Sequence, residues 1–386
     1  MSETDGASPA PAPLVAEPAM TTRKLQYDGR AGDIAGIALT NGLLTLATLG
    51  IYRFWGRTRL RRYYWGRVAF DDDRLEYTGR GLELFIGFLV ALVILFLIFG
   101  SFAGLEAISV YSSPSLGPLY AVIQLLQLLA IVVLIQVAVF RARRYRLSRT
   151  QWRGIRLGQS GSSFRYALLS LGWLFVSLLT FGLAANVHSA RTQAYRTDHT
   201  WFGDQRLEFR GNAGDLFAPW FLAWFLWPFT LGISMIWYRV KEFRYFTAST
   251  RLGALEFRSE LHTGRLLLLF LLFYLAMMAI FGLAAAAIYF LVPSFWQAYS
   301  DMSRGVPGAA QEVFTAAHWL VLVIVVAVSV VMGVVQHVFL IHPFIRTVAQ
   351  TVTVVGQEDF ARIAQSRQAA PGRGEGLADA LDVGAI

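Results

Sequence analysis

The sequence predicts an all-α, polytopic integral membrane protein that is built from internal repeats. Three observations lead to this fold class: a high apolar content with little charge, several uncharged runs of membrane-spanning length, and a motif that recurs at fixed spacing. Of the 386 residues, 55% are hydrophobic and only 15% are charged, whereas soluble proteins average about 25% charged residues. This composition excludes an ordinary soluble domain.

Seven apolar segments account for most of the hydrophobic content. A helix of about 20 apolar residues crosses a hydrocarbon core of about 30 Å. Four runs meet this requirement clearly: 82–102, 119–140, 266–292 and 318–341. Three more are interrupted by Gly, Thr, Asn or Pro: 34–52, 166–187 and 216–238. We therefore expect about seven hydrophobic segments.

The three interrupted segments end in the same motif. In each, Thr-x-Gly closes the apolar run, a basic residue follows the Gly by nine positions, and a Tyr follows it by thirteen. The three copies are Thr48/Gly50/Arg59/Tyr63, Thr180/Gly182/Arg191/Tyr195 and Thr230/Gly232/Lys241/Tyr245. A degenerate fourth copy lacks Thr-x-Gly and keeps Arg141 and Tyr145. Repetition of one unit predicts a single domain of about five units.

A shorter phrase precedes the embedded segments. It occurs at residues 25–29, 75–79 and 207–211, and in a reduced form at 255–257. Apolar and polar residues alternate in it and Gly ends the full copies, which is typical of a short strand followed by a tight turn. We expect a brief hairpin or extended piece at the membrane surface, between the helices.

The repeat-built transmembrane domain is predicted to cover residues 25–350. Residues 1–24 are rich in Ala and Pro and lack the charged and apolar regions of a cleavable signal, so we expect a disordered N-terminal tail. Residues 351–386 form a predicted C-terminal tail, disordered from about 369, where Gly, Ala and Asp dominate. The chain has no Cys, which excludes disulfides and thiolate ligands.

The distribution of charge leaves two topologies open. The net charge is +9, but the bases flank apolar runs, as in cytoplasmic loops of membrane proteins, so we expect no nucleic-acid binding. The segments 53–80, 141–165 and 239–265 are strongly basic and should be cytoplasmic, whereas four Arg and four acidic residues balance in 188–215. Seven spans would place 188–215 outside. Re-entrant Thr-x-Gly segments would leave four crossing helices, with all motif copies and both termini inside. We expect seven spans from length and charge, and the repeat favours four.

The first unit shows a resemblance to a known family. It reads Thr-Leu-Gly-Ile-Tyr-Arg-Phe-Trp over residues 48–55, and Leu-Glu-Tyr-Thr-Gly follows at 75–79. In this pattern the sequence resembles the YjgN family of bacterial inner-membrane proteins, a family of unknown function, over most of residues 25–345. Such families commonly have Pro-Trp after the Gly, where this chain has Phe54-Trp55. The resemblance implies a multi-pass protein of the bacterial inner membrane and no assigned activity.

The basic and aromatic residues of the motif are the candidate binding residues. We call the base and the Tyr of one motif copy a collar. Tyr and Lys or Arg suit the headgroup zone, and each base near an anionic surface contributes about 1 kcal/mol. The collars are therefore predicted contacts for anionic phospholipids, or simple anchors that hold the topology. The Thr-x-Gly is interpreted as a helix-packing element or as an unwound segment that lines a transport path.

No residue set predicts a reaction. His318, His337 and His342 do not have the spacing of a zinc site, and the acidic run 71–73 lacks a second acidic cluster. We expect no enzymatic activity, metal or cofactor, with a lipid-headgroup enzyme as the remote alternative. Two functions remain: a transporter- or channel-like protein for a small or lipidic substrate, or a non-transporting scaffold that organises anionic phospholipid through its collars. Substrate and oligomeric state stay open.

Overall fold

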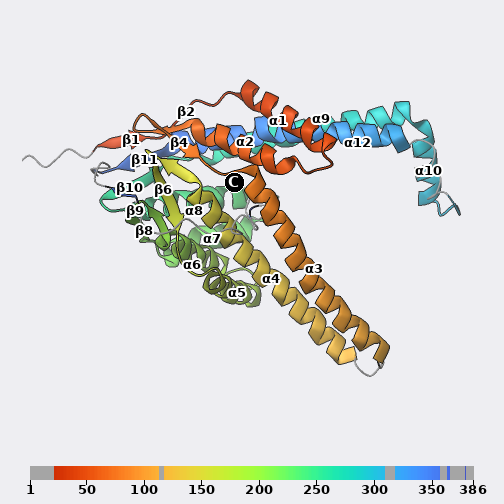
Figure 1. Cartoon of the computed structure of the whole chain (residues 1–386), viewed down its shortest axis with the longest axis horizontal. Coiled ribbons are helices and arrows are strands. Elements are labelled where there is room, and N and C mark those ends of the chain that lie inside the picture. The colour runs from red at the N-terminus through yellow and green to blue at the C-terminus, as the bar shows by residue number, and fades with distance from the viewer. Residues whose placement is uncertain (1–20, 113–116, 309–317, 357–362, 366–378, 380–386) are drawn as a thin grey trace, which may run out of the picture.

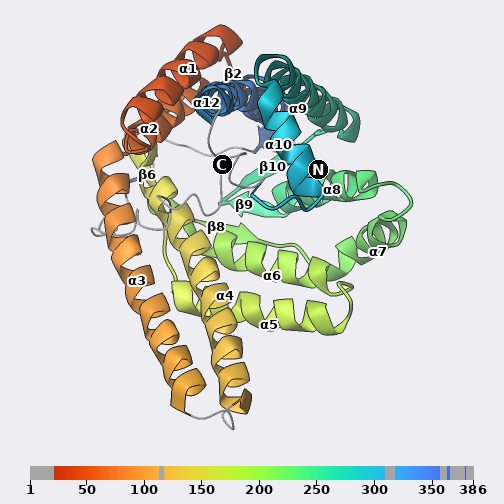
Figure 2. The same ribbon diagram turned by 90° about the vertical axis from the view of Figure 1, so that its right-hand side faces the viewer.

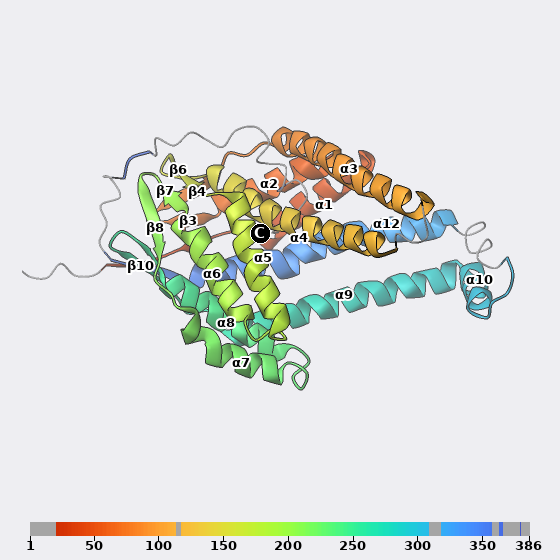
Figure 3. The ribbon, with the colours of Figure 1, turned by 90° about the horizontal axis from the view of Figure 1, so that it is seen from below.

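The structure, a computed structural model, describes residues 21–112, 117–308, 318–356, 363–365 and 379. Along this part of the chain, helical hairpins alternate with short β-hairpins (Figure 1). The β-hairpins gather at one end of the molecule, and the helices extend away from that end (Figure 3). The fold is therefore mixed, with a small sheet that joins a ring of helices.

The short strands form one antiparallel sheet of eleven strands in the order β1-β11-β10-β9-β8-β7-β6-β5-β4-β3-β2. Strands β1 and β2 stand at opposite edges of this order, but only Leu25 separates them in the chain. The sheet therefore curves into a nearly closed barrel, which removes most of the exposed edge. The strands are β1 Thr22–Lys24, β2 Gln26–Tyr27, β3 Val68–Phe70, β4 Asp73–Tyr77, β5 Thr150–Trp152, β6 Ile155–Gln159, β7 Thr200–Phe202, β8 Gln205–Phe209, β9 Thr250–Leu252, β10 Leu255–Ser259 and β11 Val352–Val355.

Apolar side chains pack together on the inner side of this barrel. The buried cluster consists of Trp152, Phe202, Leu252, Leu255, Val354 and Ile363. The Trp152 ring lies 5.7 Å from that of Phe202, and its Nε1 donates a hydrogen bond to the carbonyl oxygen of Phe70 at 3.2 Å. Because residues from most strands meet here, the cluster holds the barrel together as a small core.

The helices form five successive hairpins around a central space (Figure 2). In the described part of the chain they are α1 Ala31–Ala47, α2 Arg53–Gly66, α3 Gly81–Ser112, α4 Gly117–Ser148, α5 Ser163–Leu179, α6 Ala185–Asp198, α7 Phe217–Leu226 after the short helix η2 Ala213–Leu216, α8 Ile233–Ala248, α9 Thr263–Leu291, α10 Pro293–Ser303, and α12 His318–Val335, which continues through η3 Gln336–Ile341 into α13 His342–Thr351. The hairpins α1–α2, α5–α6 and α7–α8 are short, and the other two are long (Figure 3).

The prediction of about seven spanning segments is wrong, because four helices are long and apolar enough to cross a membrane. They are Gly81–Ala107, Leu119–Ser148, Thr263–Leu291 and Trp319–Thr351. The three interrupted segments reverse direction at Thr-x-Gly, so each apolar run is divided between two antiparallel helices. With 17 residues, α1 is about 25 Å long, which is shorter than a hydrocarbon core of about 30 Å.

Gly232 illustrates the reason for this correction. The sequence analysis placed it within a spanning segment at 216–238, but in the structure it lies in the turn between α7 and α8, immediately before Ile233. Its φ is +88°, which is outside the range of a right-handed helix. A continuous helix through 216–238 is therefore wrong, and Gly50 and Gly182, with φ of +93° and +89°, break the segments 34–52 and 166–187 in the same way.

The prediction of an all-α fold is also wrong. Strands form in the alternating phrases and join one sheet, since each of them pairs with a strand on the far side of a helical hairpin. Strand β4, for example, pairs with β5 across the whole α3–α4 hairpin. Strand β1 falls within the segment predicted as the N-terminal tail, and β11 within that predicted as the C-terminal tail. Residues 1–20, 357–362, 366–378 and 380–386 of these tails lie outside the described residues.

Candidate functional site

The Thr-x-Gly of each motif copy forms the tip of a short helical hairpin. Thr180 Oγ1 donates to the Val176 carbonyl at 2.8 Å and accepts from the Ala184 N–H at 3.1 Å, so one hydroxyl links the end of α5 to the start of α6. Thr48 and Thr230 make the same pair of bonds in their own hairpins. The positive φ of the motif glycine is a conformation that glycine adopts without steric cost.

The motif tyrosines fasten the other end of each hairpin. Tyr195 Oη accepts from the Ser162 N–H at 3.0 Å and donates to the Ser162 carbonyl at 2.9 Å. Tyr63 and Tyr245 make the same two bonds, each to the residue 33 positions earlier. Tyr145 departs from this pattern and donates to Glu83 Oε2 at 2.9 Å. These hydroxyls therefore tie the end of the second helix to the start of the first.

The motif residues thus divide between two places in each hairpin. In the third copy, Gly232 lies at the tip, whereas Lys241 lies nine residues further along the chain, within α8, which is a rise of about 14 Å. Gly232 therefore belongs to the turn and not to the collar. The same division separates Gly50 from Arg59 and Gly182 from Arg191, so the motif does not form one continuous site.

The four collar bases lie on four different helices. They are Arg59, Arg141, Arg191 and Lys241, one on each of α2, α4, α6 and α8, and all are exposed. The Lys241 ammonium lies 4.3 Å from the centre of the Trp237 ring, a cation–π contact. Each collar base thus lies exposed on a helix of its own, and lipid contact through the four bases stays a prediction.

A different set of arginines on the same helices faces the central space. Measured from the motif Tyr, the positions two before and one after line internal cavities, because residues three apart share a helical face. On α2, α4, α6 and α8 these pairs are Arg61 and Tyr64, Arg143 and Arg146, Gln193 and Arg196, and Phe243 and Phe246. One wall of the central space is therefore basic, whereas α8 contributes apolar side chains.

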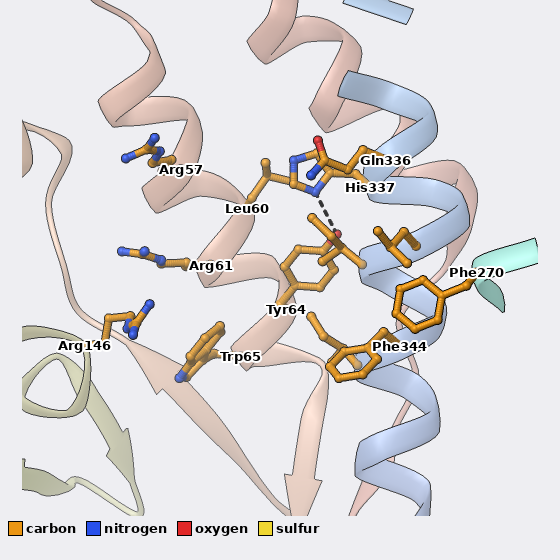
Figure 4. Close-up of a pocket in the computed structure, with 13 residues that line it drawn as sticks. Arg57, Leu60, Arg61, Tyr64, Trp65, Arg146, Phe270, Gln336, His337 and Phe344 are labelled. Atoms are coloured by element: carbon orange, nitrogen blue, oxygen red, sulfur yellow. Dashed lines mark hydrogen bonds between the residues drawn. The ribbon is translucent and has the colours of Figure 1, made fainter. Parts of the chain in front are cut away.

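Two adjoining cavities make up this space, which we call the chamber. One measures ≈400 Å³ and the other ≈760 Å³, and they share Tyr64, Trp65, Arg146 and Ile345. Figure 4 shows the smaller cavity, in which Arg57, Arg61 and Arg146 lie on one side and Phe270 and Phe344 on the other. The chamber is thus amphipathic.

One carboxylate occupies the basic wall. The side chain of Asp379 is only 1% exposed and forms an ion pair with Arg61, whose Nη2 donates to Oδ1 at 3.0 Å and whose Nη1 bonds Oδ2. Arg146 Nε lies 3.9 Å from the same Oδ1, and Arg57 Nη1 donates to the Asp379 carbonyl at 3.3 Å. Burial disfavours the charged form of Arg61, but attraction to Asp379 outweighs it and raises the pKa of the guanidinium above its usual range.

Two further chamber arginines have no carboxylate partner among the described residues. Arg143 Nη2 donates to Thr200 Oγ1 at 3.5 Å, and Arg196 Nη2 donates to Gln193 Oε1 at 3.1 Å. These neutral partners do not balance the charge, and an uncompensated cation inside a protein is costly. The chamber is therefore suited to an anion. No group of three His, Asp or Glu side chains able to hold a metal occurs in the described part of the chain.

The sequence interpretation singled out the base nine residues after each motif Gly, and the arginines that line the chamber lie at other positions of the same helices. Residues Arg57 and Arg61 lie four positions apart on one face of α2, whereas Arg59 lies between them on the opposite face. The spacing Arg57/Arg61 and Arg143/Arg146 was a signal that could have identified the inward face. The neighbouring Asp379 gave no such signal, because it lies more than 300 residues from Arg61 in the sequence.

The family model described as "Bacterial protein of unknown function (DUF898)" matches residues 22–232, more than half of the chain. The chain belongs to this family. This membership confirms the YjgN-family resemblance found in the motif, and the matched range contains three of the five helical hairpins and part of the fourth.

A 70-residue stretch is also similar to the "Inner membrane protein YjgN" of Salmonella typhimurium (strain LT2), with 36% identity. This match covers 18% of the chain and 18% of that relative, so the chain spans under a fifth of the relative's length. No solved structure matches the chain. With its four apolar helices, the chain is a YjgN-like inner-membrane protein of a family whose function is unknown.

Proposed function

We propose that this inner-membrane protein binds an anionic ligand in the chamber, as the recognition step of a transporter- or channel-like activity. The observation that carries the proposal is the basic wall, to which three hairpins contribute largely buried arginines while the described residues supply one carboxylate. Guanidinium groups bind carboxylate and phosphate through paired, charge-assisted hydrogen bonds. Buried charge next to membrane helices is costly and typically marks a ligand or ion path.

The proposal includes four membrane crossings, with the barrel and the basic segments on the cytoplasmic side. The three short hairpins then enter the membrane from that side and turn back at Thr-x-Gly. Their tip residues support this placement, since Leu49, Phe181 and Leu231 are 95%, 86% and 94% exposed. The recurrence of the tip and tyrosine bonds also supports construction from repeats of one unit.

Cysteine labelling in whole cells tests this topology. The chain has no Cys, so single variants are free of background. A thiol in Asp204→Cys, in the exposed turn between β7 and β8, should be protected from a membrane-impermeant maleimide. A thiol in Val306→Cys, in the exposed segment after α10, should react. Labelling at position 204 in intact cells would instead place residues 188–215 outside and overturn the four-span topology.

Anion binding tests the chamber itself. In detergent-purified protein, Arg143→Gln together with Arg196→Gln should lower the affinity for glycerol phosphate at least tenfold, because about 1.4 kcal/mol per tenfold change is within the strength of one charge-assisted bond. Isothermal titration measures this affinity. The control Arg265→Gln removes an exposed base at the start of α9 and should leave it unchanged. Equal losses in both proteins, or no binding by the wild type, would remove the proposal.

A second candidate function is lipid organisation through the collars. The observation that favours it is the exposure of all four collar bases on separate helices, where each is open to an anionic surface. It predicts retention on anionic vesicles that is independent of Arg143 and Arg196. The chamber variant described above therefore separates the two functions, since it loses ligand binding but keeps vesicle retention only if the collars act by themselves.

A further inference from the structure

We infer that the chamber's ligand is an anionic phospholipid, with its phosphate at Arg57, Arg61 and Arg146 and one acyl chain in a groove between α1, α2 and α12. This inference rests on the proposed function and names its ligand class. It depends on a third cavity, which leads from the hairpin tip to the chamber.

The groove measures ≈510 Å³ and has mostly apolar walls. It begins at the hairpin tip, at Leu49 and Gly50, and ends at Arg57, Leu60 and His337. The last three residues also line the smaller cavity of the chamber. The groove and the chamber are therefore adjoining parts of one amphipathic site, apolar at the tip and basic at its inner end.

Small residues keep the groove open. Its walls include Ala38, Gly42, Gly56, Ser329 and Gly333. At Gly333 no atom lies within 4 Å of the place that a Cβ would occupy, whereas a Cβ on Gly42 would lie 3.0 Å from Val330 Cγ1. Helices α1 and α12 therefore touch at Gly42 and leave space at Gly333.

The groove borders a helix of membrane-spanning length. Val326, Ser329 and Val330 of its wall belong to α12, within the candidate span Trp319–Thr351. An apolar groove on such a helix faces acyl chains rather than water. A membrane lipid is therefore the occupant that reaches the site directly from the bilayer, and a soluble anion would leave the apolar part unfilled.

The inner end of the groove already shows how an anion is held. Two oxygens of the Asp379 carboxylate bond the two terminal nitrogens of Arg61, and Arg146 lies beside them. A phosphodiester presents the same pair of oxygens, so the headgroup would take the place of Asp379. Charge complementarity thus selects an anionic headgroup over a zwitterionic one.

A second observation points to a ligand in the groove. The side chain of Asn41 is 6% exposed, and its Nδ2 donates to the Gly56 carbonyl at 3.0 Å. Its Oδ1 is buried without a hydrogen-bond partner, although buried polar atoms are nearly always paired. Because Asn41 lines the same groove as Arg57, a hydroxyl of a glycerol headgroup would satisfy this oxygen.

Native mass spectrometry of detergent-purified full-length protein tests the inference. Titration with dioleoyl phosphatidylglycerol should show one tight site. The affinity of this site for dioleoyl phosphatidylcholine should be at least tenfold lower. Gly333→Leu should block the groove and Arg61→Gln should remove the headgroup contact, each weakening phosphatidylglycerol binding at least tenfold. Asp379→Asn should strengthen it, because a competing carboxylate is lost. The matched control is Gly104→Leu, on the exposed side of α3 with open space at its Cβ, which should bind as the wild type does.

The outcomes separate this inference from the proposed function. In one outcome, glycerol phosphate binds in an Arg143- and Arg196-dependent way, phosphatidylglycerol binds no more tightly than glycerol phosphate, and Gly333→Leu has no effect. The chamber is then an anion site and the lipid inference is wrong. Equal binding of phosphatidylglycerol and phosphatidylcholine also overturns the inference. If neither anion binds, both proposals fall. Circular dichroism of each variant ensures that the comparison is made between folded proteins.

Discussion

Trp152→Ala should lower the free energy of unfolding by about 3–5 kcal/mol, the range for removal of a large buried aromatic side chain. Trp152 is 4% exposed and contacts Phe70 of β3 and Phe202 of β7, each two strands away from β5 in the sheet. The strands are only two to five residues long, so each has few pairing bonds of its own. The loss should therefore act on the whole barrel rather than on β5 alone.

Thermal unfolding in detergent, followed by near-UV circular dichroism, measures this effect. The matched control is Trp319→Ala at the start of α12, where the side chain is 80% exposed. This control should change the midpoint little. Equal midpoints for the two variants would mean that the barrel core does not stabilise the fold.

Phe181→Asp should destabilise the protein in a lipid bilayer by about 2.5–3.5 kcal/mol, the cost of an acidic side chain near the centre of a membrane helix. Phe181 lies at the tip of the α5–α6 hairpin with φ of +50° and is 86% exposed. Asp adopts this left-handed conformation more readily than Phe does. The left-handed backbone and an aqueous surface would both favour Asp over Phe at this position. A loss of stability is therefore expected only if the tip is buried in hydrocarbon.

The sign of the change decides where the tip lies. Urea denaturation of protein reconstituted in vesicles, compared with the same protein in mild detergent, measures it. Val306→Asp, at an exposed position after α10, is the control and should change stability by less than about 0.5 kcal/mol. A neutral or stabilising effect of Phe181→Asp in vesicles would show that the hairpin stays outside the hydrocarbon.

The recurring motif acts mainly as a structural device. Thr180 and Gly182 reverse the chain at the hairpin tip, and Tyr195 fastens the two helices at the other end. Each of these bonds joins residues within one helical hairpin, which explains why the pattern can be recognised in the sequence. The positions that line the chamber are also fixed relative to the Tyr. The residue at such a position differs from one helix to the next, however, as Arg61 on α2 and Phe243 on α8 show.

The sequence by itself determined the membrane character, the family and the repeating positions of Thr, Gly and Tyr, because these depend on local composition and spacing. The tertiary structure alone decided that the phrases at 75–79 and 207–211 join a barrel, since strands this short are stable only when distant ones pair with them. It also decided that Arg61 faces inward and Arg59 outward, and that Asp379 lies beside Arg61. Long-range contacts set these features, whereas the spacing of Arg57 and Arg61 in the sequence shows only that these two residues share one helical face.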